Sequence, residues 1–150
     1  MKGFINAKTY IKGRGIVCTN IAINNGRIAE IGGSADTIEP LAQTGECLLV
    51  PGFIDEHIHG AGGADVMDGD ENALAVISET VLKEGTTAFL ATTMTQSDSN
   101  LKKALGAVAA YKKKTGAKIL GVHLEGPFIS SEYIGAQQPK FIKKPSVGYF

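Results

Sequence analysis

Between Leu48 and Glu125 the sequence alternates between strand-like and helix-like segments, and this order constrains the fold more than any other feature. The expected strands cover 48–59, 86–93 and 119–125, and the expected helices cover 71–82 and 98–114. Such alternation with short connections implies right-handed βαβ crossovers and a parallel sheet. The sequence thus predicts an α/β fold, and the order alone leaves both a doubly wound sheet and a (β/α)8 barrel open.

Caps and apolar spacing support the two helices. Asp70 can cap the first helix, and Ser97 or Ser99 can cap the second. Gly85 and Gly116 lie where helices commonly stop. We expect one buried stripe on each helix, formed by Leu74, Ile77 and Val81 on the first and by Leu101, Leu105 and Val108 on the second.

The segment ahead of Leu48 has no helical period. Short strands are expected over 4–11, 15–23 and 27–31, and Asn24-Asn25-Gly26 between the last two is a strong hairpin signal. The polar stretch 32–46 is the expected boundary. We predict a small β domain over 1–48 and an α/β part over 49–150, with Leu48-Leu49-Val50 leading into its first strand.

Composition sets limits without supplying chemistry. With 43% hydrophobic residues and zero formal net charge, it is that of an ordinary soluble protein, with no electrostatic case for nucleic-acid or membrane binding. No apolar run approaches the roughly 20 residues of a membrane span, and the start lacks a signal-peptide core. Cys18 and Cys47 are isolated, so we expect two small buried hydrophobes in a reducing cytoplasm.

Two histidines at the end of the first expected strand are the strongest candidates for chemistry. Alternate residues of an extended segment share a face, so Asp55, His57 and His59 point to the same side. The glycines at 60, 62 and 63 predict a flexible loop directly after them. A His-x-His pair alone is a weak metal signal, because a surface or structural role is commoner for histidine.

A third histidine and a glutamate lie in a comparable setting. His123 and Glu125 share one face of the strand expected over 119–125, which Gly126-Pro127 ends. Glutamate is usually a solvated residue, but the carboxyl ends of parallel strands meet at one edge of a sheet. His57, His59 and Glu125 would converge there, and nitrogen plus carboxylate ligands suit zinc, iron, cobalt or manganese.

These motifs carry a resemblance to a known family. Pro51-Gly52-Phe53-Ile54-Asp55 followed by His57 and His59, behind a small β segment, resembles the first barrel strand of the amidohydrolase superfamily. His123-Leu124-Glu125-Gly126-Pro127-Phe128 with Gly135-Ala136-Gln137 is similar to the N-acetylglucosamine-6-phosphate deacetylases within it. The first motif alone also admits dihydroorotases, hydantoinases and related deaminases.

The resemblance implies a (β/α)8 barrel beside a small β-sandwich. It implies a homodimer that hydrolyses N-acetylglucosamine 6-phosphate to glucosamine 6-phosphate and acetate in amino sugar catabolism, with one or two divalent ions. By position, Glu125 matches the principal metal ligand, His57 and His59 a second metal position, and Ala136 and Gln137 a substrate-contacting pair. The family's aspartate acid/base falls beyond Phe150, so no catalytic residue is expected in this chain.

Only three of eight barrel strands are expected here, so we predict an incomplete and inactive amino-terminal part. It would expose apolar side chains such as Leu74, Ile77, Leu101 and Leu105. Two alternatives stay open, an amidohydrolase acting on a cyclic amide and a non-catalytic α/β binding module. The lysines at 112–114 and 143–144 are interpreted as solvated charges.

Overall fold

The computed structural model describes residues 1–42, 45, 47–112 and 115–149, and the chain divides into two compact units, Met1–Pro51 and Gly52–Phe150. The division into compact units lies after Pro51, three residues beyond the predicted domain boundary at residue 48. The reason is that β5 (Leu48–Leu49) pairs in parallel with β1 (Lys2–Ile11), so the segment expected to lead into the first strand of the α/β part belongs to the amino-terminal sheet.

The first unit is a five-stranded sheet in which β1 pairs with β2 (Gly15–Asn24), β4 (Glu39–Pro40) and β5. β3 (Arg27–Ile31) pairs with β2, and the 3-10 helix η1 (Ala35–Thr37) precedes β4. The predicted hairpin is confirmed, since Asn25 and Gly26 have φ of 50° and 73° between the paired Asn24 and Arg27. Positive φ at both central residues is the mark of a type I′ turn.

Both cysteines are exposed, so the prediction that they are buried hydrophobes is wrong. Cys18 pairs across the sheet with Lys8, which is also exposed, and therefore faces the open side of β2. Cys47 directly precedes β5. The buried apolar residues of this unit are elsewhere: Ala7, Ile21, Ala22 and Ile38.

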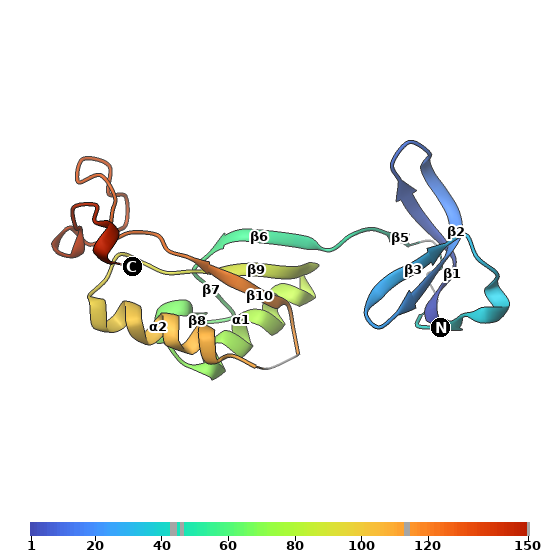
Figure 1. Ribbon diagram of the computed structural model, residues 1–150, viewed down its shortest axis with the longest axis horizontal. Coiled ribbons are helices and arrows are strands. Elements are labelled where there is room, and N and C mark those ends of the chain that lie inside the picture. Colours follow the sequence, from blue (N-terminus) through green and yellow to red (C-terminus); the bar gives the residue numbers. More distant parts are fainter. Residues whose placement is uncertain (43–44, 46, 113–114, 150) are drawn as a thin grey trace. The chain divides into compact units, whose positions relative to one another are not determined.

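The second unit is a parallel sheet of three strands with both helices on one face (Figure 1). The strands are ordered β10-β9-β6, with both neighbouring pairs parallel. Along the chain the elements follow the predicted order of strand, helix, strand, helix, strand, which confirms an α/β architecture. Their bounds are β6 (Phe53–Ile58), α1 (Glu71–Lys83), β9 (Thr86–Thr92), α2 (Asp98–Ala110) and β10 (Lys118–His123).

The core lies between the helices and the sheet, around the fully buried ring of Phe89. Leu74, Ile77 and Leu101 are buried, which corrects the expectation that they would be exposed. Each helix covers its own apolar stripe by packing it against the sheet. Large exposed apolar side chains of this unit occur on the strands, where Phe53 is 68% and Ile54 is 63% exposed, and also on α1 and in the segment after β10.

The helix starts agree with the prediction, but one helix end does not. The Asp70 carboxylate accepts the N–H groups of Asn72 and Ala73, each at 2.9 Å, and caps α1. Ser97 caps α2. This helix ends at Ala110 because Tyr111 takes extended backbone angles and packs against the core cluster. The expected end at Lys114 lies outside the described residues.

Gly116 does not end a helix. It lies just before β10, with φ of +85°, where a Cβ would clash with Ser78 Oγ. The Ser78 hydroxyl also donates to the Ala117 carbonyl at 2.6 Å. A glycine is needed here because α1 approaches the backbone closely.

The region around the histidines differs from a simple strand and loop. The register of β6 with β9 shifts between Asp55 and Ile58, so the strict alternation expected along this strand is interrupted. The expected flexible loop is an ordered hairpin of β7 (Gly60–Ala61) and β8 (Ala64–Asp65). The 3-10 helices η2 (Val66–Asp68), η3 (Pro139–Phe141) and η4 (Val147–Tyr149) complete the unit.

In the part of the chain that the structure describes, neither helix is long and apolar enough to cross a membrane.

Candidate metal centre

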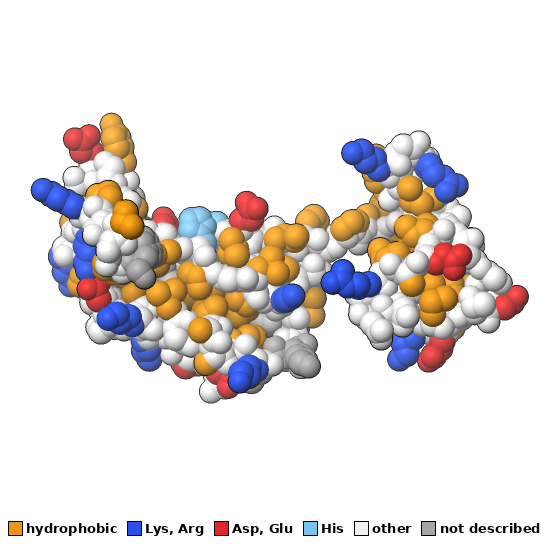
Figure 2. Space-filling model, viewed as in Figure 1, with side chains coloured by type: hydrophobic (Ala, Val, Ile, Leu, Met, Phe, Trp, Pro, Cys, Tyr) orange, Lys and Arg blue, Asp and Glu red, His pale blue; other side chains and the backbone are white. Residues whose placement is uncertain are grey.

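His57 and His59 lie at the carboxyl end of β6, on the face of the sheet that the helices leave open. Ile58 between them packs against the core, so its two neighbours point the other way. Histidine side chains are accordingly visible at the surface of this unit in Figure 2. The two imidazole Nε2 atoms lie 3.4 Å apart, so the two rings converge from positions about 6.6 Å apart along the extended chain.

Glu125 reaches the same point from the segment after β10. Its Oε2 lies 3.2 Å from His57 Nε2 and 2.9 Å from His59 Nε2. β10 ends at His123, so Glu125 sits two residues past the strand and not at its end as expected. The predicted convergence of the three side chains at the carboxyl edge of a parallel sheet is therefore present in the structure.

The tautomer of the neutral His59 ring follows from the hydrogen bond of its Nδ1 atom. Its Nδ1 lies 3.2 Å from the Thr92 carbonyl oxygen, which can only accept, so Nδ1 carries the proton. In the neutral imidazole, Nε2 then presents a lone pair toward Glu125 Oε2. Two acceptors at 2.9 Å require a proton or a cation between them.

The donor set fits a divalent metal ion. Glu125 Oε2 is buried and accepts no hydrogen bond from the described residues, although two imidazoles lie beside it. Ligands placed tetrahedrally around zinc at about 2.0–2.1 Å lie about 3.3 Å from one another. The three ligand atoms are close to that spacing, and they form a group that could hold an ion. One ion would bind the lone pairs of His57 Nε2, His59 Nε2 and Glu125 Oε2 together. A proton on one imidazole would join only that ring to Glu125.

His123, the third histidine, lies beside this group rather than in it. Its ring centroid is 4.6 Å from that of His57, at an interplanar angle of 72°. Its Nδ1 lies 3.0 Å from the Glu56 carbonyl oxygen and therefore donates to it. The sequence placed His123 and Glu125 on one face without indicating this contact.

The two residues predicted to contact the substrate, Ala136 and Gln137, differ in their exposure to solvent. Ala136 lies on an exposed turn. Gln137 is buried, and its Oε1 accepts the N–H of Thr95 at 2.6 Å while its Nε2 faces Met94 Sδ at 3.6 Å. The Gln137 side chain thus ties the segment after β10 to the segment after β9.

A charged cluster that the sequence did not suggest ties the same segment to α2. Lys143 Nζ lies 2.7 Å from Asp98 Oδ2, and the Tyr149 hydroxyl donates to Asp98 Oδ1 at 2.7 Å. These bonds to Lys143 and Tyr149 hold the pKa of the Asp98 carboxyl below its usual value, and Asp98 raises the pKa of both partners. Lys143 is therefore paired, contrary to the prediction of a solvated charge.

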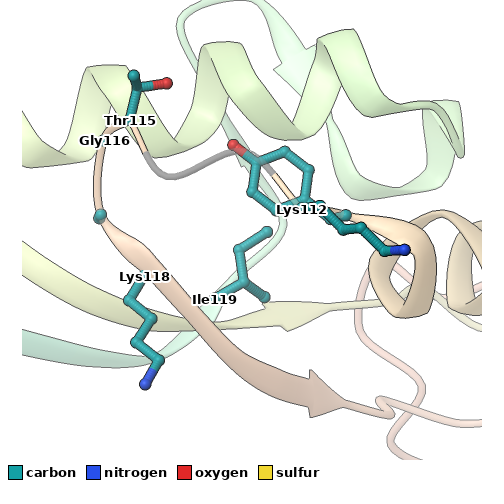
Figure 3. Close-up of a pocket in the computed structure, with 7 residues that line it drawn as sticks. Lys112, Thr115, Gly116, Lys118 and Ile119 are labelled. Carbon is teal, nitrogen blue, oxygen red and sulfur yellow. The ribbon is translucent and has the colours of Figure 1, made fainter.

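A hollow at the opposite end of β10 from His123 is separate from the candidate metal centre. Lys112, Thr115 and Lys118 are among the residues that line it (Figure 3). Lys112 is exposed, as predicted, and Lys113 and Lys114 lie outside the described residues.

Known proteins are similar to this chain in sequence and in fold. The chain is 39% identical over 155 residues to the N-acetylglucosamine-6-phosphate deacetylase of Bacillus subtilis (strain 168), which covers 93% of this chain and 39% of the relative. It is 35% identical over 99 residues to the N-acetylgalactosamine-6-phosphate deacetylase of Escherichia coli O157:H7, covering 65% and 26%. The crystal structure of N-acetylglucosamine-6-phosphate deacetylase from Thermotoga maritima matches with a TM-score of 0.78 and 32% identity, covering 97% and 38%.

The chain thus spans less than half the length of these relatives. Their names confirm the resemblance that the two motifs indicated. The model of the amidohydrolase family matches residues 48–149, from β5 through the segment after β10. The chain belongs to the amidohydrolase family.

Proposed function

We propose that the protein is a metal-dependent hydrolase that removes acetate from N-acetylglucosamine 6-phosphate. The observation that carries this proposal is the meeting of His57, His59 and Glu125 around one point, in a chain whose relatives bear the name of that deacetylase. We propose Glu125 as the principal metal ligand and the two histidines as further ligands. Zinc, iron, cobalt and manganese all suit this donor set.

The chain's own groups prepare the centre for this role. The Thr92 carbonyl holds the His59 ring so that Nε2 faces Glu125. The Asp55 carboxylate accepts the backbone N–H of His57 at 3.0 Å and fixes the strand end from which His57 projects. When bound, a divalent ion lowers the pKa of a coordinated water to about 7 and polarises an amide carbonyl.

The proposed function implies a larger protein architecture than the two compact units of this chain. We propose that β6, β9 and β10 are the first three strands of a (β/α)8 barrel, that the amino-terminal sheet is part of a β-sandwich, and that the protein acts as a homodimer. Ala136 and Gln137 are proposed substrate contacts. The two free, exposed cysteines suit a reducing cytoplasm, where we expect the protein to act.

Acetate release by the full-length protein tests the function. We expect metal-dependent deacetylation of N-acetylglucosamine 6-phosphate. Glu125→Gln keeps the size of the side chain and removes its charge. Loss of a residue that merely orients a metal ligand typically lowers metal affinity or activity roughly 10- to 100-fold. Loss of the proposed ligand itself should lower bound metal and turnover by more than that. Glu132→Gln, at an exposed glutamate of the same segment, is the matched control and should behave as the wild type.

The choice of substrate separates the alternatives. N-acetylgalactosamine 6-phosphate is the second substrate to assay, because one relative bears the name of that deacetylase. Turnover of dihydroorotate or a hydantoin without deacetylation would replace the proposal with a cyclic-amide hydrolase. A full-length protein that binds no divalent metal and turns over none of these compounds would favour a binding module.

A further inference from the structure

The two histidines of the candidate metal centre are oriented by different means. His59 is held by a hydrogen bond from Nδ1 to the Thr92 carbonyl, and its own carbonyl accepts the N–H of Val66 at 2.8 Å. Among the described residues, the polar contacts found for the His57 ring are all with the ligand group itself, through Nε2. The His57 ring also lies edge to face against the His59 ring, with 5.1 Å between centroids, but the His57 side chain is 48% exposed, so little outside the ligand group confines it.

The ring of His123 supplies this missing constraint. It packs edge to face against the His57 ring, with 4.6 Å between centroids. Its Nδ1–H donates to the carbonyl of Glu56, the residue that directly precedes His57. One side chain therefore contacts both the ring of His57 and the backbone that carries it.

The position of His123 in the sheet explains how it reaches β6. β9 lies between β10 and β6, so the ring of His123 crosses over β9 on the face that the helices leave open. In closed parallel barrels, one layer of inward side chains comes from alternate strands. His57 and His123 have this relationship. The backbone at His123 is fixed in turn, because its carbonyl accepts the N–H of Thr93 at 3.0 Å.

We infer that His123 is a positioning residue, which holds His57 in the orientation that binds metal without being a ligand itself. The inference rests on the proposed function, because it presupposes a metal ion at the three-residue group. Orienting partners of metal ligands typically contribute about 10- to 100-fold to metal affinity.

Cobalt binding to the full-length protein tests the inference without relying on activity. Co²⁺ affinity is measured by competition with a chelator, and ligand geometry by the visible absorption of the bound ion. His123→Ala removes both contacts, His123→Asn keeps a donor for the Glu56 carbonyl, and His123→Phe keeps a ring against His57. Lys118→Ala, at the exposed other end of β10, is the control.

We expect His123→Ala to lower Co²⁺ affinity about 10- to 100-fold and to alter the absorption spectrum. His123→Asn and His123→Phe should each recover part of the loss, and Lys118→Ala should match the wild type. If His123→Ala does not fold, the other two variants decide, and wild-type affinity and spectrum in both would overturn the inference. Loss of one whole equivalent of cobalt would also overturn it, because His123 would then be a ligand.

Cobalt binding by the wild-type protein distinguishes failure of the metal centre from failure of the positioning role. A wild-type protein that binds Co²⁺ and deacetylates its substrate, with every His123 variant equal to it, refutes the positioning role alone. A wild-type protein that binds no Co²⁺ refutes the metal centre and the positioning role together.

Discussion

At the scale of single residues, two backbone carbonyls orient the side chains around the candidate metal centre: the Thr92 carbonyl accepts from His59 and the Glu56 carbonyl accepts from His123. His57, His59 and Glu125 could be predicted because parallel strands bring their carboxyl ends to one edge. The hydrogen bonds that orient them could not, since the Thr92 and Glu56 carbonyls belong to the backbone and leave no mark in residue type. Gln137 shows the same limit, because its burial depends on where a whole segment folds back.

Gln137→Ala should destabilise the protein. The substitution leaves the N–H of Thr95 without its acceptor in a buried position, which costs about 1–3 kcal/mol. The midpoint of denaturant unfolding measures the change. Gln138→Ala, at the exposed neighbouring residue, should stay within about 0.5 kcal/mol of the wild type. Equal midpoints for the two variants would show that the Gln137 side chain does not anchor this segment.

At the scale of elements, regular apolar patterns predict the structure, whereas the irregular segments depend on contacts that local sequence does not specify. α1 and its cap could be predicted because apolar spacing and Asp70 agree. The end of α2 could not, because the packing of Tyr111 against the core overrides a lysine run with good helix propensity. The segment after β10 has no repeating pattern, so its attachment to α2 through Asp98 and Lys143 emerges only from the structure.

This attachment should depend on pH. The pKa of Asp98 is below its usual value of 3.8 in the folded protein, so its contribution to stability is present above that pH and is lost as pH falls through the folded pKa. Asp98→Asn should therefore lower the melting temperature near neutral pH, and the difference from the wild type should vanish well below pH 3.8. Thermal unfolding across this range measures it.

A matched variant checks the assignment to Asp98. Glu132→Gln removes an exposed carboxylate of the same segment and should show no such pH-dependent difference. The Lys143 and Asp98 side chains are 37% and 49% exposed, so solvent reaches the pair and its effect should also weaken at high salt. A difference between Asp98→Asn and wild type that persists unchanged into acid would mean that the pairing with Lys143 is not its source.

At the scale of the whole molecule, the alternation of strands and helices predicted the parallel second unit and its helix-covered core. The compact units divide after Pro51, close to the predicted boundary at residue 48, and the short apolar run at Leu48 and Leu49 is compatible both with a strand of the first sheet and with the start of a barrel strand. In the structure these residues pair with β1, and such long-range pairing cannot be predicted from the local sequence.

Metal removal should destabilise the full-length protein. An ion bound by the folded state alone stabilises it by mass action, by about 2.7 kcal/mol when the free ion is at 100 times its dissociation constant. Dialysis against a chelator should therefore lower the melting temperature, and restoring the ion should raise it again. Glu125→Gln should abolish most of this response, and an undiminished response in that variant would place the ion elsewhere.

The distance along the chain between the proposed ligands bears on folding order. Along the sequence, both α1 and α2 lie between His57 and Glu125, so no short segment of the chain contains the whole centre. Contacts of such long sequence separation form only after loop closure has been offset by other interactions. The centre should accordingly appear last during refolding, and cobalt absorption should lag behind the recovery of helical circular dichroism.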